Sequence, residues 1–214
     1  MLPNPDQFSR FLEVFVHDLR SPLGVAQGYM NLLQGGQLAD ADRARAMKGV
    51  VNALSRLTTL VDHAGELTSL DRGEGHGGVR VAADEVCHRV MAQATRRGVL
   101  TESSGIAAGV SVRAGHSVDA LVDAIALLLD LASTHGPATP KWLLRTRIDG
   151  GVLSFALTPP EAAVVADLVA CDPWSYGKVD YLVAHRRLIS VGGGAWCQVG
   201  KTRAGCVTLP VEPV

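Results

Sequence analysis

Several classes of protein are excluded by what this sequence lacks. Its 20 lysine and arginine residues are balanced by 21 acidic residues, so no overall basic field attracts nucleic acid. No apolar run approaches the ~20 residues with which a helix crosses a bilayer. The N-terminus has neither the basic nor the apolar region of a secretion signal. We therefore expect a cytoplasmic protein with no membrane and no nucleic acid among its partners.

The chain is also poor in cysteine pairs. Its four cysteines are far apart and form no C-x-x-C motif, and the histidines show no metal-ligand spacing. Zinc sites and disulfide frameworks need ligands or partners at recognisable spacings. We expect reduced, mostly buried thiols and no metal held by this chain. The cysteines are Cys87, Cys171, Cys197 and Cys206.

What the sequence does contain is enough apolar material for two small folded domains. Hydrophobic residues make up 47% of the 214 residues and charged residues 19%, which indicates a globular chain. Residues 71–78 hold four glycines and no apolar residue, a composition typical of a linker. We predict one domain over residues 1–72, a linker over 73–78 and a second domain over 79–214.

The N-terminal domain is predicted to be an antiparallel helical hairpin. Apolar residues recur at near-heptad spacing over residues 5–34 and again over 39–70, and Gly35-Gly36 separates the two runs. Helices of roughly 45 Å would leave much of both apolar stripes exposed in one hairpin. We expect a homodimer that closes a four-helix bundle; the alternative is packing of the stripes on the C-terminal domain. The stripes are Phe8, Leu12, Phe15, Leu19, Ala26, Met30 and Leu33, and Met47, Val50, Leu54, Leu57, Val61 and Ala64.

The C-terminal domain is predicted to have an α+β fold. Helical segments are mixed with strands that are mostly joined as hairpins, one of them around Asp149-Gly150-Gly151. This order favours helices packed on one face of a sheet. The predicted strands are residues 79–81, 110–113, 142–148, 152–157, 194–199 and 205–210, and the predicted helices are 82–97, 117–133, 161–170 and 179–191.

The stretch with the most chemical meaning is His17-Asp18-Leu19-Arg20-Ser21-Pro22-Leu23, in the first helix. A neutral imidazole is a good nucleophile near neutral pH, and its phosphoramidate is a good phosphoryl donor. Asp18 is expected to orient the ring or accept its proton, and Ser21 to position a water for the reverse, hydrolytic reaction. Pro22 is expected to bend the helix beside His17 because it removes a backbone hydrogen bond. We predict His17, Asp18 and Ser21 as catalytic residues.

Small and polar residues continue from His17 along the outer face of the same helix. Two of them are glycines, and each glycine within a helix costs about 1 kcal/mol relative to alanine. Such residues on one face indicate the close approach of another backbone; packing within the bundle is the alternative, although the heptad phase places this face away from the apolar seam. We predict a docking surface for a partner, formed by Arg20, Gly24, Gln27, Gly28 and Asn31 beside Ser21.

The segment from His17 to Leu23 resembles the phosphoacceptor box of the sensor histidine kinases of two-component signalling. The surrounding hairpin is similar to their dimerisation and histidine-phosphotransfer domain, and the order of elements after residue 78 resembles their ATP-binding domain. The resemblance implies an α/β sandwich for the second domain and response-regulator receiver domains as partners. Within the family, the chain looks most like the dimeric histidine phosphotransferases of bacterial phosphorelays.

Three nucleotide-binding boxes of that family are missing from the C-terminal domain. Leu131 stands where the family has a metal-binding asparagine, and leucine offers no oxygen to Mg²⁺. Thr158-Pro159-Pro160-Glu161 replaces an Asp-x-Gly-x-Gly box, and Tyr176-Gly177-Lys178-Val179-Asp180 keeps only one glycine of a phosphate loop. We expect no cofactor on this chain and Mg²⁺ supplied by the receiver partner.

Three functions follow as alternatives. The first is a phosphotransferase in which His17 passes a phosphoryl group between receiver aspartates without ATP. The second is a non-catalytic pseudo-histidine-kinase that binds and regulates a response regulator or a kinase. The third is a working autokinase with an unusual nucleotide site, which Leu131, Thr158 and Val179 disfavour.

Overall fold

The computed structural model divides into two compact units. The hairpin unit comprises Met1–Thr68 together with Trp174–Asp180, and the sheet unit comprises Ser69–Pro173 and Tyr181–Val214. A short segment late in the sequence therefore belongs with the N-terminal helices. The residues that the structure describes are 5–36, 38–71, 78–104, 109–115, 117–134, 142–159, 169–172, 174, 177–198 and 204–213.

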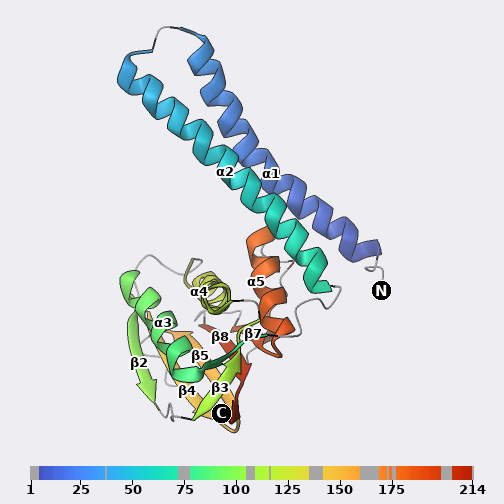
Figure 1. Cartoon of the computed structure of the whole chain (residues 1–214), viewed down its shortest axis with the longest axis vertical. Coiled ribbons are helices and arrows are strands. Elements are labelled where there is room, and N and C mark those ends of the chain that lie inside the picture. Colours follow the sequence, from blue (N-terminus) through green and yellow to red (C-terminus); the bar gives the residue numbers. More distant parts are fainter. Residues whose placement is uncertain are drawn as a thin grey trace. The chain divides into compact units, whose positions relative to one another are not determined.

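The hairpin unit is built on two long helices, α1 (Pro5–Gln34) and α2 (Asp40–Asp71) (Figure 1). Both agree with the predicted helices to within one residue. Gly36 has a φ of +72°, a left-handed conformation that glycine adopts without a steric penalty and that ends a helix. The helical hairpin expected from the heptad pattern is confirmed.

The two helices contact each other through small side chains. Ala26 on α1 and Ala46 and Ala53 on α2 are buried, and Leu60 is fully enclosed. The apolar stripe predicted for α2 includes the residues that directly follow the three buried ones in sequence. These residues, Met47, Leu54 and Val61, are each more than half exposed (57%, 53% and 59%).

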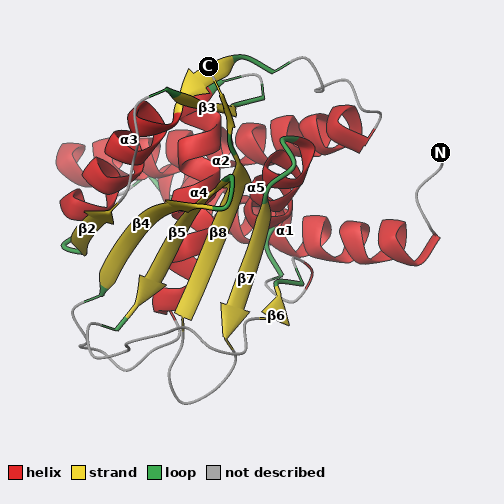
Figure 2. Ribbon diagram, turned by 90° about the horizontal axis from the view of Figure 1, so that it is seen from below, coloured by secondary structure: helices red, strands yellow, loops and turns green. Residues whose placement is uncertain are grey.

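The sheet unit holds a six-stranded sheet in the order β2-β4-β5-β8-β7-β6 and a small sheet in the order β1-β3-β9 within its described residues. Strands β2 and β4 are parallel, and the other paired strands are antiparallel. Helices α3, α4 and α5 lie on one face of the larger sheet (Figure 2). The bounds are β1 (Arg80–Ala82), α3 (Ala83–Arg96), β2 (Leu100–Ser104), β3 (Val110–Arg113), α4 (Val118–Thr134), β4 (Leu143–Asp149), β5 (Val152–Thr158), β6 (Val169–Ala170), α5 (Val179–Ser190), β7 (Gly194–Gln198), β8 (Ala204–Pro210) and β9 (Glu212–Pro213).

The core of the sheet unit follows from the alternation of its strands. In β5, Leu153, Phe155 and Leu157 are buried, whereas the side chains between them are less enclosed. On the covering helix α4, Leu121 and Ile125 are buried. The predicted α+β class, with helices on one face of a sheet, is confirmed.

Two local predictions need correction. The predicted helix over residues 161–170 is wrong at its end, because Val169–Ala170 form strand β6 and pair with β7; residues 161–168 lie outside the described part. Strand β2 was not predicted, since Leu100–Ser104 is polar and lacks apolar alternation. In both cases pairing with a distant strand decides the conformation, and local sequence carries little signal of it.

Candidate functional site

His17 lies on α1 with 72% of its side chain exposed. Its Nδ1 is 3.5 Å from Oδ1 of the neighbouring Asp18, at the outer limit of a hydrogen bond. The opposite ring nitrogen, Nε2, therefore faces away from the carboxylate. An imidazole with this exposure is accessible to a macromolecular partner.

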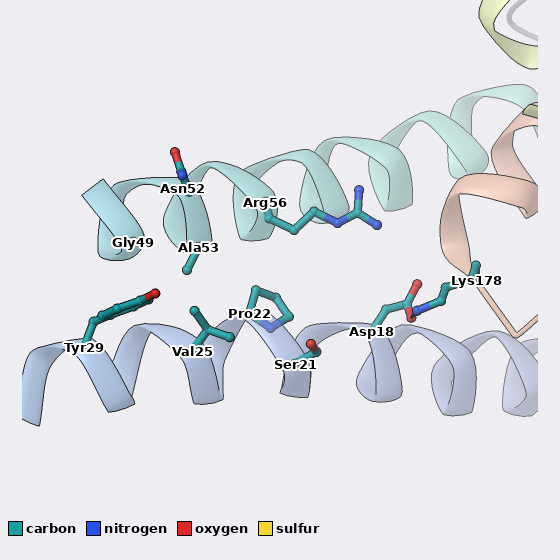
Figure 3. Close-up of a pocket in the computed structure, with 10 residues that line it drawn as sticks. All are labelled: Asp18, Ser21, Pro22, Val25, Tyr29, Gly49, Asn52, Ala53, Arg56 and Lys178. Carbon is teal, nitrogen blue, oxygen red and sulfur yellow. Dashed lines mark hydrogen bonds and ion pairs between the residues drawn. The ribbon is translucent and has the colours of Figure 1, made fainter. Parts of the chain in front are cut away.

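Asp18 is the opposite of His17 in burial, with only 2% of its side chain exposed. Its Oδ2 accepts a hydrogen bond of 3.0 Å from the backbone N–H of Val179, and its Oδ1 lies 3.3 Å from Nζ of Lys178. Val179 is the first residue of α5, so the carboxylate also meets the positive end of a helix dipole. Figure 3 shows the Asp18 and Lys178 side chains pointing toward one another.

The turn before Val179 sets up this contact. Gly177 has a φ of +59°, and its N–H is 3.4 Å from the carbonyl oxygen of Trp174. A residue with a Cβ atom rarely adopts this left-handed conformation. Gly177 therefore turns the chain so that Lys178 and Val179 meet Asp18.

A second carboxylate, Asp180, links the same segment to α2. Arg56 donates from both terminal nitrogens, at 3.1 Å to Oδ1 and 2.6 Å to Oδ2, and Nδ1 of His63 lies 2.9 Å from Oδ1. Burial alone would raise the pKa of Asp180, but the hydrogen bonds and charges of His63 and Arg56 outweigh it and lower the pKa to about 2. His63 belongs to no motif in the sequence, and the structure makes it part of this cluster.

A groove of about 360 Å³ runs along the hairpin beside this cluster (Figure 3). Its polar end is formed by Asp18, Ser21, Arg56 and Lys178, so the predicted catalytic residue Ser21 faces the same space as the carboxylate of Asp18. The rest of the lining consists of Pro22, Val25, Tyr29, Gly49, Asn52 and Ala53.

Gly49 is required by the wall of this groove. A Cβ atom at Gly49 would overlap the ring of Tyr29, which lies across the α2 backbone at that point. Sequence analysis did not single out Gly49, Tyr29 or Asn52, because their juxtaposition depends on how the two helices pair.

The predicted docking residues occupy the exposed face of α1. At Gly24 and Gly28 an added Cβ would meet no atom within 4 Å, so no part of this chain that the structure describes requires glycine there. Helix α1 continues through Pro22, which is buried; the predicted bend at that residue stays a prediction. The exposed residues of the predicted surface are Arg20, Gly24, Gln27, Gly28 and Asn31.

The residues predicted to replace the nucleotide-binding boxes make contacts within the fold where the structure describes them. Thr158 is buried at the end of β5, and its Oγ1 lies 3.4 Å from Nη1 of Arg145. Asp180 is held by Arg56 and His63, and Val179 is fully buried. Leu131 belongs to the backbone of α4, but its side chain lies outside the described residues, as do Glu161 and Tyr176.

Cys87 and Cys206 form no disulfide bond. Burial, together with the nearby charge of Asp84, raises the pKa of Cys87 to about 12, and burial raises the pKa of Cys206 to about 11. Thiols with such pKa values carry almost no thiolate at neutral pH and are poor nucleophiles. Among the residues described, no cluster of three or more histidine, cysteine or acidic side chains could hold a metal ion, and no helix is long and apolar enough to cross a membrane.

Comparison with solved structures finds sensor histidine kinases. Acinetobacter baumannii histidine kinase AdeS matches with a TM-score of 0.62 and 13% identity, over 91% of this chain and 97% of AdeS. Histidine kinase ThkA, in complex with response regulator protein TrrA, matches with a TM-score of 0.58 and 12% identity, over 96% of this chain and 61% of that one. Full-length ShkA in complex with AMPPNP matches with a TM-score of 0.56 and 17% identity, over 99% of this chain and 47% of ShkA.

These likenesses concern the fold, because all the identities are low. No family model matches the sequence, and no curated protein matches it either. The chain has the fold of a sensor histidine kinase, built from a helical hairpin and a helix-covered sheet. The predicted resemblance to that family is confirmed.

Proposed function

We propose that this protein is a histidine phosphotransferase of a two-component phosphorelay. His17 takes a phosphoryl group from the phospho-aspartate of one receiver domain and delivers it to the aspartate of another, without using ATP. The observation that carries the proposal is the pairing of an exposed imidazole with a buried, hydrogen-bonded carboxylate on the next residue.

The chemistry follows from which ring nitrogen meets Asp18. A proton on Nδ1 is held by Oδ1 of Asp18, which leaves the lone pair of Nε2 for attack on phosphorus. As the N–P bond forms, the P–O bond to the receiver aspartate breaks and the aspartate leaves as a carboxylate. The phosphorylated ring keeps its Nδ1 proton and becomes cationic, and Asp18 stabilises that charge. Transfer to the second receiver reverses these steps.

The exposed face of α1 supports a receiver domain as the partner. Gly24 and Gly28 leave open space on this face, and the groove that begins at Ser21 continues beside it. ThkA, which has the same fold, is described in complex with a response regulator. The receiver domain brings its own aspartate, and the Mg²⁺ of the reaction is supplied with it.

Independence from ATP is supported by the residues at the nucleotide-binding boxes. ShkA is described in complex with AMPPNP, so the same fold holds a nucleotide analogue in that protein. In this chain Thr158 is buried, and Asp180, near the position of the phosphate loop, is a carboxylate paired with Arg56 and His63. A carboxylate repels phosphate, and neither residue supplies the backbone freedom of a glycine-rich loop.

The apolar stripes support a homodimer as the working form. Exposed apolar side chains along both helices would be covered if two hairpins formed a four-helix bundle. The stripe members that are exposed in the described part of the chain are Phe8, Leu12, Met30, Met47, Leu54 and Val61.

The proposal is tested by incubating the purified protein with receiver domains that carry labelled phosphate. Label should appear on the wild type and be absent from His17→Ala, with the helical content of both unchanged. Persistence of label on His17→Ala would contradict the assignment of His17. Loss of receiver phosphate without label on the wild type would indicate phosphatase activity in which Ser21 positions water. Binding of receivers without any loss of phosphate would favour the non-catalytic pseudokinase.

A further inference from the structure

We propose that Lys178 is a positioning residue for phosphoryl transfer at His17. It acts through Asp18, by holding the carboxylate at the Nδ1 edge of the imidazole. This inference rests on the proposed function and names a residue distant in sequence that prepares the nucleophile. Its basis is a single oxygen atom, Oδ1 of Asp18, which lies 3.3 Å from Lys178 Nζ and 3.5 Å from His17 Nδ1.

The first step of the argument is the burial of Asp18. A carboxylate removed from water is costly unless hydrogen bonds and a countercharge replace its hydration. The N–H of Val179 satisfies Oδ2, at 3.0 Å. Oδ1 has two neighbours among the contacts that the structure describes, and of these only Lys178 carries a permanent charge. The ammonium group of Lys178 is therefore the charged group that holds Oδ1 of Asp18 in its position.

The second step is that the placement of Lys178 does not depend on its own side chain. Val179, the next residue, is fully buried, and Gly177 before it adopts a left-handed turn. The Lys178 side chain itself is half exposed (50%). Removing its ammonium group should therefore leave the backbone of this segment, and the Val179 hydrogen bond, in place.

The third step links the lysine to reactivity. With both oxygens fixed, Oδ1 selects the tautomer of His17 that carries its proton on Nδ1 and keeps the lone pair on Nε2. If Lys178 loses its charge, Oδ1 is free to turn away from the ring, and the Nδ1–H tautomer loses its preference. The reaction at Nε2 then slows, although His17 and Asp18 are both present.

The test separates His17 reactivity from partner docking by using phosphoramidate, a small phosphoryl donor, together with labelled receivers. Lys178→Met keeps the length and apolar stem of the side chain without its charge, and Lys178→Arg restores the charge. Lys48→Met, an exposed lysine elsewhere on the hairpin, is the matched control. Nitrogen-15 NMR of the His17 ring reports which nitrogen carries the proton.

We expect Lys178→Met to be phosphorylated about tenfold more slowly by both donors, with a smaller Nδ1–H fraction of the His17 ring. Lys178→Arg should restore both readouts, and Lys48→Met should match the wild type. Equal rates for Lys178→Met and wild type would overturn the inference, as would a slower rate with an unchanged tautomer ratio. If the wild type takes no phosphate at His17 from either donor, the proposed function fails, whatever the Lys178 variants do.

Discussion

The two units of the molecule differ in how they use their apolar residues. The sheet unit encloses its core, with Phe155, Leu153 and Leu209 fully buried between the strands and the covering helices. The hairpin unit buries mainly alanines and leaves large side chains such as Leu54 and Val61 exposed. A sheet covered by helices is stable by itself, whereas a hairpin with two exposed stripes gains stability from a second apolar surface. The contrast is between a unit that encloses its large apolar side chains and a unit that leaves many of them exposed.

The largest expected effect comes from truncating a core side chain of the sheet unit. Phe155→Ala should lower the free energy of unfolding by about 3–5 kcal/mol, because a fully buried ring is replaced by a cavity. Val152→Ala, on the same strand but partly exposed, should have a much smaller effect. Denaturant unfolding measures both; similar losses for the two variants would mean that the sheet unit is not the self-sufficient scaffold.

The next effect is expected at the exposed stripe of the hairpin. Leu54→Glu should weaken self-association at least about 100-fold, which corresponds to about 2.7 kcal/mol, because a charge would enter an apolar interface. Ser55→Glu, one residue further along α2, is the matched control with the same added charge. Sedimentation equilibrium over a range of concentrations gives the dissociation constants. An unchanged dimer in Leu54→Glu would exclude the α2 stripe from the interface.

A smaller effect concerns the segment that carries Asp180. Its pKa of about 2 lies below the ordinary value of 3.8, so the ionised carboxylate contributes stability at pH values above about 4. This contribution, at most about 2 kcal/mol, should disappear as the pH falls from about 4 to about 2. The difference in unfolding free energy between the wild type and Asp180→Asn should shrink over this window. A difference that stays constant there would show that the Arg56 and His63 contacts do not stabilise the protein.

The smallest expected effect is at Gly24 on α1, where one substitution should raise stability and weaken receiver binding. Gly24→Ala should stabilise the hairpin by about 1 kcal/mol, because a Cβ there meets open space and alanine favours a helix. The same change should weaken receiver binding if another backbone approaches this face. Gly49→Ala is the contrasting case, since its Cβ would displace Tyr29 and lower stability. Calorimetric titration with a receiver would refute the docking surface if Gly24→Ala bound as tightly as the wild type.

The sequence carried most of the fold because its signals are local and repeated. The heptad spacing of α1 and the His17 box lie within one continuous segment, so both could be predicted without knowledge of distant contacts. The contacts of Asp18 could not, because Lys178 and Val179 are 160 and 161 residues away. Asp180 shows the same limit, because its pairing with Arg56 joins residues 124 apart.

The long separation between Asp18 and Val179 also has a consequence for protein synthesis. Contacts between residues so far apart form late in folding, after the local helices, because a long loop must close first. A growing chain exposes the hairpin and its histidine well before residues 177–180 leave the ribosome. The carboxylate beside His17 is therefore fixed in place only after residues 177–180 have been synthesised. A translation product interrupted before residue 177 would carry His17 without the contacts that hold Asp18 in place.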